Sequence, residues 1–596
     1  MIFAAHLAND DATAWRDAVT RHAAWLGLAV RSTAIPLTNG RTAHCAWLGP
    51  ASVLGASPCA SPPADAALVL TTSGGEVPVP GLRSADAMRR LLADANQPAA
   101  IRMGFLPATG EILVAVPPAA VEQFYFAPVG EGWALSNDLR LMARLTGGDL
   151  DETGILGLFR YGLTPAPLTL FRDTRRVPVG HLLRIGPEGK PALERFALLG
   201  DASARDPGAD PQTLIRDTLD AILARAPASP VVYFSGGVDS SLIAARLAAL
   251  GRTDAVLVNY AFGPGDDKAE CARRIAQHLG LQFHQIAWNP AEIPTVLERI
   301  GRDYPFPFCD TALIPGNLLA HATLPLAGPS RTTLHGVGAG APFGQRLHIR
   351  RLWRPLGRVP KFARQALAWP YAGLGLWRWD SPIVRPFSVL RRSISVPILH
   401  TMMCEHPMEG IAYAMPPGVG RALDAAIRDY VEPLSAGRGY DLLTSVLHQM
   451  YFTSREFSAV VLGPQMAAGV ESVAPFMEPQ MMTRAFALTW DEKRPNGVPK
   501  GLLRNLLAES LPPDLARAIG GSFLAPQRQI HTHPAMRALV EDVVLRADNP
   551  VIALCRAGTV RAMLERLLRG EGVAPEAHKF AWTIIFASAW LRQIRE

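Results

Sequence analysis

The spacing of apolar and polar positions divides the chain into two parts. Up to about residue 200, short apolar runs alternate with turns rich in Gly and Pro, which predicts a β-rich domain. The clearest runs are 67–70, 111–116 and 123–126. Asn137 precedes an apolar-periodic stretch that ends at Arg144, so we expect it to cap a short helix there.

Beyond a polar stretch at 201–210, which is typical of a linker, the pattern changes. Strand-like runs now alternate with helical ones, which predicts a parallel, doubly wound sheet. We therefore predict an α/β protein with a β-rich domain over 1–200 and a parallel-sheet domain over 211–596. The expected elements are helix 214–223, strand 231–234, helix 241–250, strand 255–260, helix 268–279 and strand 283–287.

Composition narrows the class of protein. The 596 residues are 49% hydrophobic and 19% charged, as in globular proteins, and the net charge of +7 suits anionic ligands without implying nucleic acid binding. The six cysteines form no CxxC pair and no signal peptide is evident, so we expect a reducing cytoplasm. The apolar run 580–591 is too short to span a bilayer and predicts a buried helix rather than a transmembrane segment.

One motif carries candidate chemistry, and it lies between strand 231–234 and the following helix. A Gly-rich turn that leaves a parallel strand and opens a helix presents backbone N–H groups to a phosphate. The serines add hydroxyl donors, and the carboxylate is an oxygen ligand for Mg²⁺. The motif lacks the GxxxxGK[ST] pattern of a Walker A loop. Its residues are Ser235, Gly236, Gly237, Val238, Asp239, Ser240 and Ser241, with Asp239 as the candidate metal ligand.

This loop resembles that of the ATP pyrophosphatases, and its surroundings are similar to the asparagine synthetase branch. Asp310 lies in a similar acidic segment before a helix, and a Met-Ala-x-x-x-Glu segment followed by Pro-Phe ends at Phe476. The run 499–504 matches a Lys-x-x-Leu-Arg segment. The resemblance implies ATP and Mg²⁺ as cofactors, an N-terminal domain of the Ntn-hydrolase type, and formation of an acyl-adenylate with release of pyrophosphate.

The resemblance also assigns roles to single residues. Lys500 would neutralise charge that develops on the α-phosphate and pyrophosphate, and Glu471 would orient or deprotonate the attacking amine. A surface lysine and a buried structural carboxylate are the alternative interpretations. Val258 would line the adenine pocket, and Gly336 would approach the ribose.

Tyr440 and Tyr451 are candidate partners for Glu471, and the sequence does not choose between them. Core packing is the alternative interpretation for both tyrosines.

Two departures from the family refine this expectation. Glutamine-using members start with a catalytic cysteine, whereas here the first cysteine is Cys45, so we expect a degenerate glutaminase-like domain and an amine supplied by the substrate. The family also has a Ser-Gly-x-Gly-x-Asp-Glu turn with a second Mg²⁺ ligand, and here Gly340 stands at the Asp position. Either Asp239 binds Mg²⁺ with phosphate and water, or Asp303 or Asp310 substitutes, or catalysis is lost.

Among offshoots without the glutaminase, the chain most resembles the lasso-peptide macrolactam synthetases. An Arg- and Trp-rich insertion at 346–392, with Asp380 as its only acid, suits a peptide substrate, and a solvated or membrane-apposed segment is the alternative. The expected reaction joins an Asp or Glu side chain of a linear precursor peptide to its N-terminal amine, with a leader peptidase as partner. A ligase for a small amino acid, as in β-lactam formation, and a non-catalytic homologue are the other hypotheses.

Overall fold

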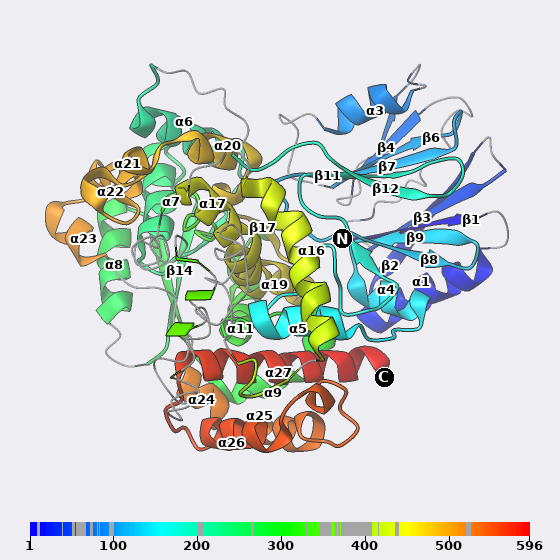
Figure 1. Cartoon of the computed structure of the whole chain (residues 1–596). Coiled ribbons are helices and arrows are strands. Elements are labelled where there is room, and N and C mark those ends of the chain that lie inside the picture. The colour runs from blue at the N-terminus through cyan, green and yellow to red at the C-terminus, as the bar shows by residue number, and fades with distance from the viewer. Residues whose placement is uncertain are drawn as a thin grey trace. The chain divides into compact units, whose positions relative to one another are not determined.

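The chain forms two compact units in the computed structural model. One unit contains Met1–Ile155 and Thr164–Asp201, and the other contains Leu156–Leu163 and Ala202–Glu596. Figure 1 shows their helices and strands. The structure describes residues 1–8, 12–37, 40–50, 54, 67–71, 76–79, 82, 84–93, 101–200, 208–263, 267–328, 330–344, 359–360, 362–363, 366–367, 370, 408–414, 416–435, 440–519 and 526–596.

The first unit consists of two six-stranded antiparallel sheets, ordered β10-β8-β9-β1-β3-β2 and β12-β11-β7-β6-β4-β5. Apolar side chains from both sheets, such as Trp47 and Phe105, share one core. The strands are β1 (Ile2–Ala8), β2 (Ala29–Pro36), β3 (Thr42–Gly49), β4 (Ala67–Thr71), β5 (Glu76–Val79), β6 (Arg102–Leu106), β7 (Glu111–Val116), β8 (Tyr125–Val129), β9 (Gly132–Ser136), β10 (Arg175–Arg176), β11 (His181–Ile185) and β12 (Pro191–Arg195).

Helices cover the outer faces of these sheets. Helices α1 (Thr13–Leu26) and α4 (Leu139–Thr146) contact strands of the first sheet, and α3 (Ala85–Leu92) contacts β6 and β7 of the second. The β-rich character predicted for this part of the chain is confirmed. Cys45 lies in β3 and is fully buried, so its thiol is not placed as an exposed nucleophile.

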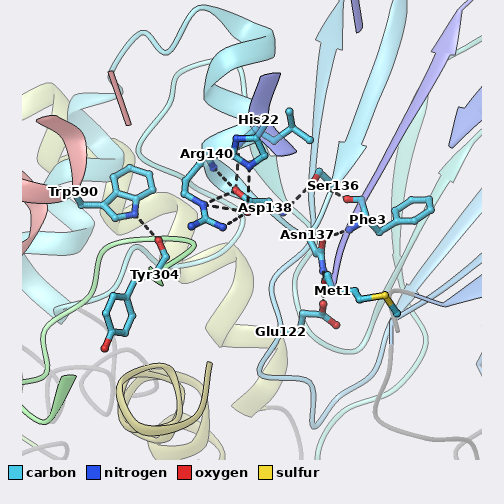
Figure 2. A network of polar contacts seen from close by, with 11 residues as sticks. Met1, Phe3, His22, Glu122, Ser136, Asn137, Asp138, Arg140, Tyr304 and Trp590 are labelled. Carbon is cyan, nitrogen blue, oxygen red and sulfur yellow. Dashed lines mark hydrogen bonds and ion pairs between the residues drawn. The ribbon is translucent and has the colours of Figure 1, made fainter. Parts of the chain in front are cut away.

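The predicted cap of the short helix was wrong by one residue. Asp138, not Asn137, accepts hydrogen bonds from the amides of Arg140 and Leu141 at 2.8 and 3.2 Å, and α4 begins at Leu139. Asn137 instead binds the first strand, because its Oδ1 accepts from the amide of Phe3 at 2.7 Å (Figure 2). The side chain of Asn137 therefore makes its hydrogen bond to a neighbouring strand, and not to the helix that the local pattern predicted.

A buried charge network surrounds this cap (Figure 2). Nε of Arg140 donates to Oδ1 of Asp138 at 3.0 Å, and Nε2 of His22 lies 3.6 Å from Oδ2, with all three side chains inaccessible to solvent. Burial alone would raise the pKa of Asp138, but the positive charge of Arg140 and the contact with His22 hold that pKa well below its usual range. The cap is therefore an ionised carboxylate in the interior.

The second unit is built on a five-stranded parallel sheet, ordered β15-β14-β13-β16-β17. Its strands are β13 (Val231–Tyr233), β14 (Val256–Ala261), β15 (Gln282–Ala287), β16 (Thr332–Leu334) and β17 (Glu471–Val473). On one face the sheet shares a core with α6 (Pro211–Leu223), α7 (Val238–Ala249), α8 (Asp267–Leu279), α20 (Pro479–Ala487) and α22 (Gly501–Ala508).

The opposite face packs against α11 (Leu313–Thr323), where the hydroxyls of Tyr233 and Thr323 lie 3.1 Å apart. Helices on both faces of a parallel sheet confirm the coarse α/β class predicted for this part of the chain. Figure 1 shows these helices around β14.

The remaining elements of this unit are mostly helical. They are η1 (Pro290–Glu292), α9 (Ile293–Leu297), α10 (Ile300–Asp303), η2 (Leu324–Leu326), α16 (Pro417–Ser435), α17 (Tyr440–Leu447), η4 (His448–Thr453), α18 (Ser454–Phe457), η5 (Ser458–Leu462), α19 (Gly463–Ala468), η6 (Pro475–Met477), α21 (Trp490–Lys493), η7 (Pro495–Gly497), α23 (Pro513–Ala518), α24 (Gln527–His531), α25 (Pro534–Leu539), η8 (Val540–Val544), η9 (Ile552–Leu554), α26 (Ala557–Leu568) and α27 (Pro575–Arg595).

Residues 156–163 belong to this unit, although the sequence places them in the N-terminal domain. They form the end of α5 (Glu152–Tyr161) and the turn after it. The ring of Phe159 packs on Tyr413 and Phe580, with centroids 5.1 and 5.3 Å away. These aromatic contacts, made to residues remote in sequence, hold the segment in the C-terminal unit.

Helix α27 is the buried terminal helix that the run 580–591 predicts. Trp582 and Trp590 are almost inaccessible to solvent, and Nε1 of Trp582 donates to the carbonyl of Asp310 at 2.9 Å. Nε1 of Trp590 donates to the carbonyl of Tyr304 at 2.7 Å (Figure 2). Both tryptophans are therefore core residues. No helix in the described ranges is long and apolar enough to cross a membrane.

Candidate functional site

The Gly-rich loop lies at the carboxyl edge of the parallel sheet, between β13 and α7. Gly237 is extended and Gly236 has a φ of 70°, a left-handed conformation that glycine adopts without strain. A Cβ on Gly236 would also meet the Cβ of Ala272 at 3.3 Å. The turn therefore depends on glycine for both its conformation and its packing.

Helix α7 begins at Val238, three residues before the position that the sequence pattern predicts. Its first helical hydrogen bond runs from the amide of Ser241 to the carbonyl of Gly237 at 3.0 Å. Asp239 and Ser240 thus belong to the first helical turn, where backbone N–H groups have no partner within the helix. This end of α7 has the geometry that binds phosphate in other proteins.

The serine hydroxyls organise the loop internally. The Oγ atoms of Ser235 and Ser240 are 3.2 Å apart, Ser240 Oγ donates to the carbonyl of Gly237 at 3.3 Å, and Ser235 Oγ accepts from the amide of Gly237 at 3.3 Å. Ser241 is fully buried, and its Oγ has no hydrogen-bond partner among the described residues. Two serines therefore fix the turn, whereas the hydroxyl of Ser241 retains its hydrogen-bonding capacity.

Lys500 lies directly against the loop, as an ion pair between its Nζ and Oδ2 of Asp239. The two side chains are 14% and 22% exposed, respectively. Lys500 has a left-handed backbone (φ 54°, ψ 31°) at the residue before α22, and α22 packs on α7. The other carboxylate oxygen of Asp239, Oδ1, is buried and has no hydrogen-bond partner in the described part of the chain.

Strand β14 supports the loop from the side. The carbonyl of Val258 accepts from the amide of Phe234 at 2.8 Å, and Nδ2 of Asn259 donates to the carbonyl of Phe234 at 2.8 Å. Val258 and Asn259 are both buried, and Oδ1 of Asn259 has no partner within the described ranges. Sequence reasoning missed Asn259, and its signal was a lone amide in an otherwise apolar strand.

Gly336 follows β16 and touches the first turn of α7. A Cβ at this position would lie 2.9 Å from the Cβ of Asp239 and 3.0 Å from the backbone nitrogen of Ser240. The structure therefore brings Gly336 together with the loop, Lys500 and Val258.

Glu471 is placed apart from this group. It is the first residue of β17, is exposed, and pairs with Thr332 at the start of β16. Since Thr333 pairs with Val231, Glu471 lies at the amino edge of the sheet, whereas the Ser235–Ser241 loop leaves the carboxyl edge. The catalytic role of Glu471 stays a prediction that the strand register does not favour. The side chains of Tyr440 and Tyr451 are outside the described residues.

The residues present fit a single magnesium ion only in part. No group of three or more His, Cys, Asp and Glu side chains gathers within the described ranges. Mg²⁺ commonly binds one or two carboxylates together with substrate phosphates, which suits Asp239 and its unpartnered Oδ1. Gly340 contributes no carboxylate.

The two alternative acids already have partners. Asp303 binds Arg299 at 3.3 Å and Nδ2 of Asn317 at 3.1 Å, and burial raises its pKa. Burial also raises the pKa of Asp310, whose Oδ1 accepts from the amide of Ala312 at 2.9 Å. Asp239 also has a partner, Lys500, but its Oδ1 has none among the described residues, and its role as the metal ligand stays a prediction. The Arg- and Trp-rich insertion at 346–392 lies outside the described residues except for a few positions.

A comparison with curated proteins finds no match. Among solved structures, one titled as the allosteric regulatory enzyme of purine biosynthesis covers 48% of this chain and 80% of its own, at 9% identity and a TM-score of 0.23. The glutamine phosphoribosylpyrophosphate amidotransferase from B. subtilis, complexed with ADP and GMP, covers 48% and 65% at 10% identity and a TM-score of 0.20. These low scores support no conclusion about fold or function.

The family profile of asparagine synthase matches residues 213–592. This range contains the Gly-rich loop, Gly336 and Lys500, and it covers more than half of the chain. The chain therefore belongs to the asparagine synthase family, which indicates an ATP-dependent ligase that forms amide bonds.

Proposed function

We propose that this ligase closes a macrolactam ring in a linear precursor peptide, as in lasso-peptide biosynthesis. An Asp or Glu side chain of the peptide attacks the α-phosphorus of ATP, and the bond to the leaving pyrophosphate breaks. The N-terminal amine of the same peptide then attacks the acyl carbon, loses a proton, and releases AMP. A leader peptidase would supply the free amine.

The observation that carries the ATP chemistry is the contact of Lys500 with the Ser235–Ser241 loop. A fixed ammonium beside the N-terminus of α7 can stabilise negative charge as it develops on pyrophosphate. The loop amides and Ser241 would bind phosphate oxygens, and Val258 would lie against the adenine. Asp239 would hold Mg²⁺, which supplies charge neutralisation on the phosphates when bound.

The choice of a peptide substrate depends on the resemblance to macrolactam synthetases. A ring closure also gains from holding the amine and the acyl group together, because well-oriented intramolecular reactions reach effective molarities of about 10⁵–10⁸ M. Glu471 is not part of this proposed site, because it lies at the other edge of the sheet. The proton acceptor for the amine is thus not assigned.

The test uses two forms of a candidate peptide with one acidic acceptor side chain. With the free amine, we expect ATP–pyrophosphate exchange, AMP formation and a product lighter by one water. With an acetylated amine, we expect exchange without ring closure, since only the second step is blocked. Lys500→Met should lose both activities, and Lys190→Met, an exposed lysine of the N-terminal unit, is the charge-matched control.

Two results would decide for another hypothesis. Exchange with free amino acids but with no peptide would favour a small-substrate ligase of the β-lactam or asparagine type. Tight ATP binding without exchange for any carboxylate would favour a non-catalytic homologue, for which the glycine at position 340 is the motivating observation.

A further inference from the structure

The ion pair of Asp239 and Lys500 places a cation of the protein on the candidate metal ligand. The partners are 261 residues apart in sequence, so the contact is made by the packing of α22 on α7. Lys500 lies in a tight turn, because a Cβ on Gly501 would come within 2.8 Å of Cδ of Pro495. The ammonium is therefore delivered to Asp239 by a well-packed segment rather than by a loose surface side chain.

The charges at this point balance without a metal. Asp239 supplies one negative charge and Lys500 one positive charge, and both side chains are largely withdrawn from solvent. Within the described ranges, Asp239 belongs to no group of three or more His, Cys, Asp or Glu side chains that could hold a metal ion. A free divalent cation would therefore meet a carboxylate that Lys500 already neutralises, outside any three-ligand group, which is a poor site for a strongly hydrated ion.

We propose that Lys500 acts as the resident cation of Asp239 and is exchanged for a divalent cation that arrives together with the phosphates of ATP. This inference rests on the ATP site proposed above. In the exchange, the metal takes the carboxylate, and the ammonium moves to phosphate oxygens, so each charge keeps an opposite partner. Oδ1 of Asp239, which is buried and has no hydrogen-bond partner among the described residues, is the second oxygen available to the incoming ion.

The exchange makes metal binding conditional on the nucleotide. Before ATP binds, the tethered ammonium competes with the metal for Asp239. After ATP binds, the phosphates attract both cations, and the competition ends. Nζ of Lys500 would therefore have two roles. Before ATP binds it would block the metal ligand Asp239, and after ATP binds it would neutralise the phosphates.

The experiment measures Mn²⁺ binding by electron paramagnetic resonance, with the full chain, in the presence and absence of α,β-methylene ATP. For the wild type, we expect weak binding of Mn²⁺ alone and binding of one Mn²⁺ with the nucleotide. Lys500→Met should bind Mn²⁺ alone about 10-fold or more tightly than the wild type, because it removes a competing charge at contact distance. Lys500→Asn, which tolerates a left-handed backbone, is the second variant.

A matched control separates displacement from general electrostatics. Arg504→Met removes a positive charge one turn further along α22, where Nε of Arg504 donates to the carbonyl of Pro499 at 3.3 Å. Among the described residues, the ion pair of Asp239 is with Lys500 and not with Arg504. This variant should bind Mn²⁺ alone as the wild type does.

The outcomes separate the exchange from the proposed function. Equal Mn²⁺ affinity of the wild type and of both folded Lys500 variants, without nucleotide, overturns the exchange. So does tight Mn²⁺ binding to the nucleotide-free wild type. Absence of any binding of α,β-methylene ATP would instead count against the ATP site itself.

Discussion

Replacing Gly336 by alanine tests whether the close approach of this residue to α7 sets the shape of the loop. The added Cβ would lie 2.9 Å from the Cβ of Asp239 and 3.0 Å from the nitrogen of Ser240, whereas ordinary contact begins at 3.4 Å. The nitrogen belongs to the helix backbone and cannot rotate away. The first turn of α7 must therefore shift by a few tenths of an ångström, or the protein must keep the strain.

The size of the effect follows from overpacking. Inserted methyl groups in close-packed regions cost about 1–3 kcal/mol. If the strain stays in the fold, this amount is lost from the free energy of unfolding. If the loop moves instead, the same amount appears as weaker nucleotide binding, about 5- to 150-fold.

The assay therefore needs two measurements on one sample, the urea midpoint and the Kd for Mg²⁺ with α,β-methylene ATP. We expect Gly336→Ala to worsen at least one of them by the stated amount. Gly558→Ala, in α26, is the control, because a Cβ there meets nothing within 4 Å. If Gly336→Ala matches the wild type in both stability and affinity, the argument from close approach is refuted.

Three further predictions concern other parts of the C-terminal unit. Burial lowers the pKa of His531 to about 3 from an unfolded value near 6.5, so the stability that its neutral form provides is present above pH 6.5 and is lost as the pH falls. Urea titrations should show a loss of up to about 2 kcal/mol in the free energy of unfolding by pH 5. His531→Gln should reduce this pH dependence, and the exposed control His284→Gln should not. Trp590→Ala should cost about 3–5 kcal/mol of unfolding free energy, because the indole is fully buried and hydrogen-bonded to the carbonyl of Tyr304. A change in urea midpoint equivalent to less than about 1 kcal/mol would contradict this expected cost. Asn259→Leu leaves the buried carbonyl of Phe234 without its side-chain partner. We expect a cost of about 1–3 kcal/mol, divided between the free energy of unfolding and the free energy of nucleotide binding. If the urea midpoint and the nucleotide Kd are both unchanged, Asn259 does not support the loop.

Much of the parallel-sheet domain could be predicted from local pattern. β14 reads as a buried apolar run because parallel strands are covered on both faces, and the structure buries all six of its residues. The Gly-rich loop was also identifiable, because its function depends on consecutive residues in one turn. The helix start was misplaced by three residues, since Gly237 closes the first helical turn through its carbonyl and not through a capping side chain.

The sequence by itself determined the chemistry available to one short segment, 235–241. Within seven residues this segment contains a glycine turn, a helix start and a carboxylate. Only the tertiary structure decided which distant groups join it. Lys500 reaches Asp239 because α22 packs on α7, and the register of β17 places Glu471 at the amino edge of the sheet, so that its catalytic role stays a prediction. Periodicity and local conformational preference act over a few residues, whereas packing and strand register are set by residues hundreds of positions away. A motif therefore predicts its own chemistry, and the fold selects the partners.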